Sequence, residues 1–569
     1  MPAKRLPLPL LLGLLVLAGA LPAAASAQSF APLSGSAGCI IGESALNEDA
    51  AAKCTKVKAL TDVIKIAVSP DDKHVYAASD TTIVSFSRAA DTGALTFASC
   101  LSDSGDDGRL GSEGACTDGD ALNGVRDLAV SPDGKYVYAV SQYSNALVWL
   151  TRDASTGALT PAGCLKASPR GDRCGGALNL MAPSALAVSP DGRSVYVVSG
   201  FDASISVFRR DADTGALAPG GCVSDTGSDG RCVNGTALRS VGDVGVSPDG
   251  GSAYALAGGI ALTSYGRDRD TGELAPRACV LGTTLAGSGC AIAPPLAGVR
   301  DLIVAPDGQV IVADNSNSAI SVLKGDDLSP VACYVHQDPA ADDSEDVSED
   351  EESDEGEDEE EADPDEGDEE DEAEEPEPAN PDVAKCKPVK AIQNVLALAV
   401  SSDGKSLFAS SGYGYVAAFN RDPATGALTE FGCLESDPFY KSCATQDPPS
   451  YGALATTSDG RSLYATIDDG LSVLSVAVAV TNRTAKLSRS GRIGVKLACP
   501  AQRARTCRGT VGGTRYRVAR GAAATVQVRL PRRVRATLRR HGRLSVRVSA
   551  RDADRTVRAA GRKVLVSAR

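Results

Sequence analysis

Two copies of the segment GVRDL carry the residues best suited to chemistry in this 569-residue sequence. They place Arg126 next to Asp127 and Arg300 next to Asp301. A guanidinium forms paired hydrogen bonds with a carboxylate or a phosphate, so two such pairs favour an anionic or sugar-like ligand. The structural alternative is that each Asp binds backbone N–H groups of a neighbouring unit while each Arg pairs with an adjacent Asp.

These segments belong to a phrase that the chain repeats seven times. Its SPDG-like turns begin at Ser69, Ser131, Ser189, Ser247, Ala305, Ser401 and Thr457. In the second copy, VRDLAVS, KYVYAVS, NALVWLTRD and ALTPAGCL read as four short strands separated by Gly-containing turns. Four-stranded units in tandem predict an all-β ring, a β-propeller, in preference to a β-solenoid.

Two features indicate how the ring closes. The first strand of each copy carries a small residue at one position, as suits a strand crowded near an axis: Ala67, Ala129, Ala187, Gly245, Ala399 and Ala455, with Ile303 the exception. The seventh copy lacks a fourth strand, and FAPLSGSAGCI near the N-terminus reads as that strand. We therefore predict a seven-bladed β-propeller over residues 28–480, closed by an N-terminal strand that removes the sheet edges.

The phrase VSPDGKYVYAVS…RDASTGALT resembles the lactonase-type seven-bladed propellers, also called YVTN-repeat or 6-phosphogluconolactonase-like proteins. The resemblance covers about residues 29–480. It implies the seven-bladed ring and, as a possible activity, the opening of sugar lactones. It also implies a site built from charged residues of the central channel, including a His.

Aligning the first strands of the copies places one polar column at the expected mouth of the channel. Lys65, Asp127, Asp243 and Asp301 form it, and Ala185, Ala397 and Ala453 interrupt it. Arg126 and Arg300 stand in the preceding column. These six charged residues are the candidate ligand-binding residues, and we assign no residue as catalytic.

Hydrolysis of a lactone needs a general base that works near neutral pH, usually a His or a carboxyl with a raised pKa. None of the three histidines falls in the two columns. We expect His74 at the surface of a second strand, His336 in a cysteine loop and His541 outside the ring. An Asp beside an Arg is expected to have a lowered pKa, which weakens it as a base. The question of enzyme activity stays open, and the missing His argues against it.

Sixteen cysteines with recurring local spacing predict structural disulfides rather than a metal site. The expected pairs are Cys39/Cys54, Cys100/Cys116, Cys164/Cys174, Cys222/Cys232, Cys279/Cys290, Cys333/Cys386, Cys433/Cys443 and Cys499/Cys507. A basic start, an apolar run and the segment AAASA predict a signal peptide over residues 1–27. Both features indicate a secreted or cell-surface protein, and no later stretch is apolar enough to form a transmembrane segment.

Two loops match a calcium-binding loop in part. DSGDDG at 103–108 and DTGSDG at 225–230 have Asp at positions one and five and Gly at position six. Gly114 and Thr236 occupy position twelve, where an acidic ligand is needed. Ordinary turns use the same residues, so we expect no cofactor and keep Ca²⁺ as the one metal to consider.

The sequence contains two blocks of opposite charge, one inside the fifth repeat and one after the last repeat. Residues 338–382 hold 28 Asp and Glu with no Lys or Arg, which predicts a disordered insertion in the fifth cysteine loop. Residues 482–569 hold 25 Lys and Arg, and their alternating pattern predicts a small Ig-like β-sandwich. An anionic cell-envelope polymer, a protein partner or the acidic insertion itself is the expected partner. The near absence of aromatic residues in this block argues against nucleic acid.

The leading hypothesis is a secreted, monomeric propeller that binds or scaffolds other molecules and is anchored at the cell envelope by its basic sandwich. A second hypothesis is a lactonase-like hydrolase of sugar lactones that uses the channel Arg and Asp residues. A third is a calcium-dependent surface adhesin, which depends on the acidic insertion. The first explains the missing His, and the second explains the paired Arg and Asp residues.

Overall fold

A computed structural model describes most of the chain as β-strands. The described residues are 29–33, 35–43, 54–106, 114–169, 173–282, 289–293, 295–337, 385–389, 392–435, 444–445, 451–458, 460–467, 470–477, 479–480, 484–499, 506–519, 522–552 and 560–568. The expected signal peptide and acidic insertion lie outside these residues. The predicted all-β class and propeller are confirmed.

Each propeller blade is an antiparallel sheet in which the four predicted strands run from the axis outward. In blade 2 they are β9 (Val125–Val130), β10 (Tyr136–Ser141), β11 (Ala146–Arg152) and β12 (Leu159–Lys166). β10 is buried along its whole length because neighbouring blades cover both of its faces. The SPDG turn joins β9 to β10, and Gly134 adopts the positive φ of 69° that this turn requires.

The other blades repeat this order. Blade 1 comprises β4 (Lys65–Val68), β5 (His74–Ala78), β6 (Thr82–Arg88) and β7 (Leu95–Ser102). Blade 3 comprises β14 (Pro183–Val188), β15 (Ser194–Ser199), β16 (Ser204–Arg210) and β17 (Leu217–Ser224). Blade 4 comprises β19 (Val241–Val246), β20 (Ser252–Ala257), β21 (Ala261–Arg267) and β22 (Leu274–Leu281).

Blade 5 comprises β24 (Val299–Val304), β25 (Val310–Asp314), β26 (Ala319–Leu323) and β27 (Pro330–His336). Blade 6 comprises β29 (Val395–Val400), β30 (Ser406–Ser411), β31 (Tyr415–Arg421) and β32 (Leu428–Glu435). Blade 7 begins with β34 (Leu454–Thr456), β35 (Ser462–Ile467) and β36 (Gly470–Ala477).

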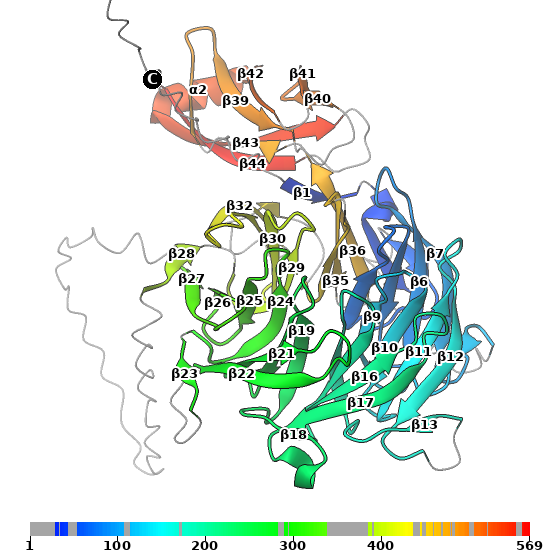
Figure 1. Cartoon of the computed structure of the whole chain (residues 1–569). Coiled ribbons are helices and arrows are strands. Elements are labelled where there is room, and N and C mark those ends of the chain that lie inside the picture. The colour runs from blue at the N-terminus through cyan, green and yellow to red at the C-terminus, as the bar shows by residue number, and fades with distance from the viewer. Residues whose placement is uncertain are drawn as a thin grey trace, which may run out of the picture.

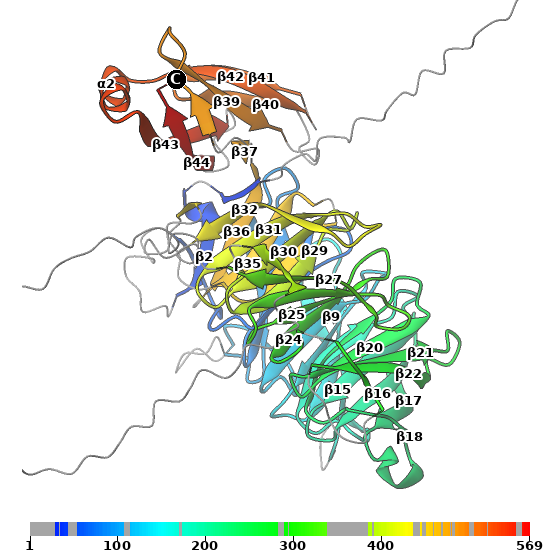
Figure 2. The same cartoon turned by 90° about the vertical axis from the view of Figure 1, so that its left-hand side faces the viewer.

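The N-terminal residues complete blade 7, as predicted. β1 (Ser29–Pro32) and β2 (Cys39–Gly42) both pair antiparallel with β36, with Pro32 opposite Leu474 and Cys39 opposite Ser472. The inner strands β4, β9, β14, β19, β24, β29 and β34 contact one another in this order, and β34 returns to β4. The ring is therefore closed, and the blades lie around one axis (Figures 1 and 2).

A fifth, short strand follows each outer strand and pairs with it in parallel, which the sequence did not predict. These strands are β3 (Thr55–Val57), β8 (Thr117–Asp118), β13 (Gly175–Gly176), β18 (Val233–Asn234), β23 (Ala291–Ile292), β28 (Lys387–Val389) and β33 (Ala444–Thr445). Two or three residues are too few to show an alternating pattern. Each short strand covers the outer edge of its blade.

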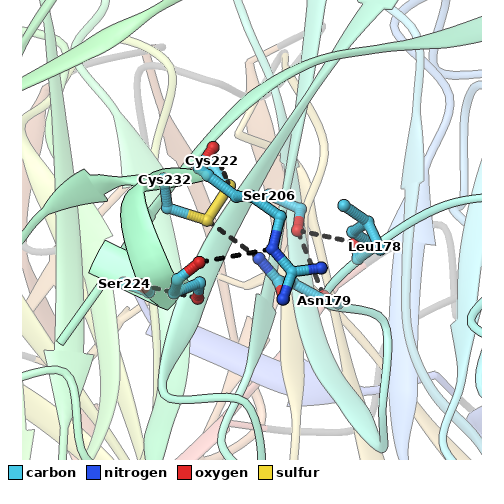
Figure 3. Close-up of a disulfide and its surroundings, with 8 residues drawn as sticks. Leu178, Asn179, Ser206, Cys222, Ser224 and Cys232 are labelled. Carbon is cyan, nitrogen blue, oxygen red and sulfur yellow. Dashed lines mark hydrogen bonds between the residues drawn. A yellow bond between two sulfur atoms is a disulfide. The ribbon is translucent and has the colours of Figure 1, made fainter. Parts of the chain in front are cut away.

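Disulfides connect the outer strands of six blades to their short strands, and a further disulfide, Cys499–Cys507, lies after the ring in the sequence. Seven predicted pairs are confirmed: Cys39–Cys54, Cys100–Cys116, Cys164–Cys174, Cys222–Cys232, Cys279–Cys290, Cys333–Cys386 and Cys499–Cys507. The eighth involves Cys443, which lies outside the described residues. Figure 3 shows Cys222–Cys232, where the Asn179 amide donates a 3.0 Å hydrogen bond to Cys232 Sγ. Such disulfides are typical of proteins that mature in an oxidising compartment.

In several blades, a buried arginine at the end of the third strand connects the blade to the preceding one. Arg210 in blade 3 donates to the Tyr138 hydroxyl at 2.6 Å and to the Asp133 carboxylate at 2.7 Å, both in blade 2. Its third contact is the Gly192 carbonyl of its own SPDG turn at 3.0 Å. We call this arrangement the blade latch. The same latch forms around Arg152 and Arg267, and in variant form around Arg88 and Arg421.

The latch also fixes the protonation of its acids. Burial opposes the ionisation of Asp71, but hydrogen bonds from Ser69 and Arg152 outweigh burial and lower its pKa to about 2. The pKa values of Asp133 and Asp191 are lowered in the same way. The ion pairs are therefore fully formed at neutral pH.

Residues 479–568 form two further sheets that lie beside β1 at one side of the ring (Figure 1). One sheet contains β37 (Ala479–Val480), β39 (Arg492–Ala498) and β42 (Ala523–Arg529). The other contains β38 (Thr484–Lys486), β40 (Cys507–Val511), β41 (Thr514–Val518), β43 (Arg543–Asp552) and β44 (Ala560–Ser567). Their inner faces share one apolar core that includes Ile493, Val495, Val528, Val548 and Val564. This is the predicted small sandwich.

A helix within the sandwich was not predicted. α2 (Arg532–His541) begins after Pro531, buries Leu538, and ends at Gly542, whose φ is 68°. Proline before the first turn and glycine after the last are typical helix boundaries. The sequence did not reveal this helix, because its many arginines obscure the helical spacing of its few apolar residues. No described helix has the length and apolar character that crossing a bilayer requires.

We expect Arg210→Met to destabilise the ring by about 3 kcal/mol, because it leaves Asp133 and the Tyr138 hydroxyl without their buried partner. Arg209→Met is the matched control, since Arg209 is the exposed neighbour on the same strand, and it should change stability by less than about 0.5 kcal/mol. Urea unfolding followed by the fluorescence of Trp149, the single tryptophan, measures both. Equal midpoints for the two variants would show that the latch contributes nothing.

Candidate functional site

The polar column predicted from the sequence comes together on the axis of the ring. Lys65 Nζ lies 3.3 Å from Asp127 Oδ1, although the two residues belong to different blades. The carboxylate of Asp127, followed by those of Asp243 and Asp301, raises the pKa of Lys65 above its ordinary value. Protein surrounds Lys65 on all sides, yet 36% of its side chain stays accessible. The axis is therefore open at this level, and four blades contribute charge to it.

Each aspartate of this channel cluster (Lys65, Asp127, Asp243 and Asp301) also bridges to the next blade. Asp127 accepts hydrogen bonds from its own following amide, Leu128 N, and from Leu186 N of blade 3. Asp243 likewise accepts from Val244 N and from Leu302 N of blade 5. The structural role that the sequence left open is thus present for the aspartates.

Asp301 differs from the other two aspartates in its hydrogen bonds. Its Oδ2 accepts from Leu398 N of blade 6 at 2.6 Å. The amide that follows it, Leu302 N, already donates to Asp243 at 2.9 Å. Within the described residues, Oδ1 of Asp301 therefore has no hydrogen-bond donor of its own, and it is the carboxylate oxygen of the cluster that is available to a ligand or a water molecule.

Burial raises the pKa of Asp301 to about 7, and the negative charge of Asp243 adds to the effect. Burial raises the pKa of Asp243 as well, while Lys65 opposes the shift. The expectation that the neighbouring arginine lowers the pKa of the aspartate is therefore wrong for Asp301. Its carboxyl changes charge close to neutral pH.

Arg126 does not pair with Asp127, contrary to the expectation for adjacent residues. A β-bulge between Val140 and Ser141 leaves Arg126 outside the strand register, so its side chain turns to the rim of the channel. There it donates to Gln142 Oε1 at 2.6 Å and lies 3.4 Å from Asp80 of blade 1. Arg300 occupies the corresponding bulge in blade 5 and is exposed. The arginines thus line the mouth above the channel cluster.

His74 is buried, and the prediction that it lies at the surface is wrong. Its Nδ1 lies 2.6 Å from Arg152 Nη2 in the latch between blades 1 and 2. Burial, followed by the charge of Arg152, lowers its pKa. His336 ends β27 and His541 ends α2, so the described structure places none of the three histidines at the axis.

The two calcium-like loops use their first aspartate for local structure. Asp103 accepts from Leu122 N at 2.7 Å, and Asp225 accepts from Leu238 N at 3.0 Å. Among the described residues, no three His, Cys, Asp or Glu side chains gather closely enough to hold a metal ion. Asp103 and Asp225 thus each hold the segment that leads into the next inner strand, and the choice between turn and calcium loop stays a prediction.

The strand pairing of the sandwich places like charges opposite each other. Arg508 is paired with Arg517 across β40 and β41, and Arg492 is paired with Arg529 across β39 and β42. All four side chains are exposed. Directly opposed like charges destabilise a sheet, so both surfaces gain stability when an anion neutralises them.

A cavity of about 300 Å³ lies away from the axis, among the outer strands of blade 5. Apolar residues of β26 and β27 line it together with Lys385 and Lys387. Its described lining contains no acid or histidine.

Residues 112–277 match the family described as lactonase, 7-bladed beta-propeller. The match spans the chain from the end of blade 1 to blade 4 and confirms the resemblance noted in the sequence. No curated protein matches the chain.

Similar solved structures include two proteins described as 6-phosphogluconolactonases. The one from Bacteroides uniformis ATCC 8492 is 15% identical, with a TM-score of 0.41, over 65% of this chain and 84% of that chain. The one from Bacteroides fragilis NCTC 9343 is 16% identical, with a TM-score of 0.42, over 82% of this chain and 96% of that chain.

We expect one carboxyl of the wild-type protein to titrate near pH 7 and to be missing in Asp301→Asn. Because folding raises the pKa of Asp301 from 3.8 to about 7, the folded chain holds a proton that the unfolded chain has released between these values. The free energy of unfolding should therefore fall as pH rises through this window, and Asp301→Asn should remove that slope.

Infrared spectroscopy of the protonated carboxyl band and urea midpoints across pH measure the two effects. Asp270→Asn is the control, because Asp270 is exposed on the opposite face of the ring. A titration near pH 7 that survives in Asp301→Asn would assign it to another group.

Proposed function

We propose that this lactonase-type seven-bladed propeller hydrolyses a lactone at the mouth of its channel. The observation that carries the proposal is Asp301: its pKa is raised to about 7, and its Oδ1 is not engaged by the described backbone. A carboxylate with these properties is suited to act as a general base at neutral pH. The sequence hypothesis of a passive binding module does not explain why the fold retains such a group.

The reaction needs only water and the residues of the axis. Ionised Asp301 removes a proton from a water molecule as the water oxygen bonds to the carbonyl carbon of the lactone. The ring C–O bond then breaks, and the proton passes to the departing ring oxygen, which yields the open hydroxy acid. Lys65 supplies positive charge beside the developing oxyanion. Arg126 and Arg300, at the rim, are suited to bind acidic or hydroxyl groups of the substrate.

The free-energy cost of ionising the channel carboxyls supports the assignment of Asp301 as a general base. The protein opposes the ionisation of Asp243 and Asp301, so ionising either carboxyl costs the folded ring free energy. Ala185, Ala397 and Ala453 occupy the same position in other blades and show that the ring does not need an acid there. Groups with strongly perturbed pKa values are concentrated at functional sites.

We expect Asp301→Asn to lower kcat/KM for a lactone substrate by about 10²- to 10⁴-fold, the usual contribution of a general base. Wild-type activity should rise with pH through about 7, because the base works only when ionised. A panel of sugar and acyl lactones, assayed by acid release at fixed pH, provides the measurement.

Asp270→Asn is again the control and should retain wild-type rates. Arg126→Ala/Arg300→Ala should act differently from Asp301→Asn: it should raise KM for an anionic lactone and leave kcat less affected. No turnover of any lactone by the wild-type protein, or turnover that Asp301→Asn leaves intact, would overturn the proposal.

A second function, anchoring of the secreted protein to an anionic envelope polymer, is favoured by the opposed arginines of the sandwich. Arg508 with Arg517 and Arg492 with Arg529 form two exposed, like-charged pairs on different sheets. A polyanion with closely spaced charges neutralises such pairs. The basic sandwich then holds the propeller at the surface while the channel stays free.

We expect the full chain to bind immobilised polyphosphate and to be released by salt, since exposed charges are screened within about 10 Å at 0.1 M salt. Arg508→Ser/Arg517→Ser should elute at clearly lower salt. Arg193→Ser/Arg269→Ser removes the same charge from the propeller face and should not. Equal loss in both variants would mean that only total charge matters.

A further inference from the structure

The exposed aromatic side chains of the propeller gather at the rim of the channel mouth. Tyr143, Phe201 and Tyr413 are 60%, 75% and 46% exposed, whereas the large aromatic residues of the blade interiors are almost fully buried. All three stand in the loop that joins the second and third strands of a blade: blade 2, blade 3 and blade 6. These loops lie at the end of the blades where the inner strands begin.

Two of the rings belong to one continuous surface on blades 2 and 3. Ala182 N donates to Asn145 Oδ1 at 2.7 Å, which joins the loop of Tyr143 to the start of blade 3. Met181, which is 43% exposed, donates its backbone N–H to Asp202 Oδ2 at 2.8 Å, beside Phe201. Tyr143, Met181 and Phe201 therefore stand exposed on segments that are hydrogen-bonded to one another, and we call these three residues the rim ridge.

Arg126 fixes the ridge to the channel. Its guanidinium lies 5.3 Å from the centre of the Tyr143 ring and donates to the Tyr143 hydroxyl at 3.1 Å. Asp127, the next residue, reaches into the channel cluster. The ridge and the cluster are therefore two ends of one surface, with the ridge outside and the acids inside.

On blades 5 and 6, the corresponding part of the rim carries amide side chains. The side chains of Asn315 and Asn394 are hydrogen-bonded to each other, and Asn317 Nδ2 donates to Asp314. Tyr413 stands in the next loop after Asn394. This part of the rim offers hydrogen-bonding groups and one aromatic ring.

We propose that the rim binds an oligosaccharide, which lies across the mouth of the channel. Pyranose rings present C–H groups on their faces and hydroxyl groups at their edges. Aromatic faces such as Tyr143 and Phe201 pack against the first, and planar amides, carboxylates and guanidinium groups bind the second. Protein interfaces also use Tyr, Phe, Met and Arg, but the amide side chains on blades 5 and 6 add the hydrogen-bonding groups that the edges of sugar rings require.

The position of the rim indicates how such a ligand is held. A chain of several sugar units spans from the ridge to the amides, whereas a single small ring fits only at one of them. The saccharide then places one unit above the channel cluster. Binding at the rim needs no hydrolysis, so the inference stands apart from the proposed lactone chemistry.

Titration calorimetry of the wild-type full chain with a panel of neutral and uronic-acid-containing oligosaccharides tests the inference. Tyr143→Ala/Phe201→Ala should weaken the affinity for the bound saccharide by at least about tenfold, because both aromatic faces that pack against the sugar rings are removed. Thermal unfolding checks that the variant keeps its fold.

Val233→Ala/Ile292→Ala is the matched control. These residues are similarly exposed, at 48% and 44%, but they stand on the short outer strands of blades 3 and 4. The control should bind the saccharide as the parent does. Failure of the parent to bind any oligosaccharide, or equal weakening by both double variants, would overturn the inference. Saccharide binding without lactone turnover by the wild-type protein would overturn only the proposed hydrolysis.

Discussion

A guanidinium buried between neighbouring blades is the interaction on which the ring depends. Apolar packing alone lets two sheets slide over each other, because it has little directional preference. The latch of Arg210 with Tyr138 and Asp133 fixes both the distance and the angle between blades, since its hydrogen bonds are directional and buried. An unpaired guanidinium there is costly, so only one blade arrangement satisfies it. The recurring Tyr, Asp and Gly of the repeat phrase are the partners of this arginine.

The latch works near the SPDG face, which leaves the opposite face free for binding. At that face the inner strands begin, and those of blades 2 to 6 each have a bulge that separates the side chain at the rim from the one at the axis. Arg126 and Asp127 are adjacent in the sequence, but the Arg126 side chain lies at the rim and the Asp127 side chain lies deeper in the channel. The side chains at the rim and at the axis can therefore differ between blades without disturbing the contacts between blades.

Asp301 has a structural role between blades and, in the proposed hydrolysis, a chemical one. One carboxylate oxygen accepts from Leu398 N and joins blades 5 and 6, as Asp127 and Asp243 do for their own neighbours. The other oxygen lacks the local amide, because Asp243 of the preceding blade already binds Leu302 N. Two acids in consecutive blades thus compete for one donor, and within the described residues the second acid is left with an oxygen that accepts no hydrogen bond. Burial, followed by the charge of Asp243, raises its pKa.

The repeat made most of the fold predictable. Strand boundaries, seven blades, closure by the N-terminus and the local disulfides follow from alternation, turn residues and the spacing of Cys, which are local properties of the chain. The six candidate residues at the channel mouth were also found by alignment of the copies. The short fifth strands and α2 were missed, since two residues or a run of arginines do not display a period.

Only the tertiary structure decided what those residues do. The burial of His74, the separation of Arg126 from Asp127 and the gathering of Tyr143 with Phe201 all depend on which blade lies beside which. A pKa depends on burial and on charges within a few ångströms in space. The raised pKa of Asp301 comes from its burial and from the charge of Asp243 in another blade, while Lys65 of a third blade opposes the shift. The sequence by itself determined the ring and its repeating contacts, and three-dimensional proximity determined its chemistry.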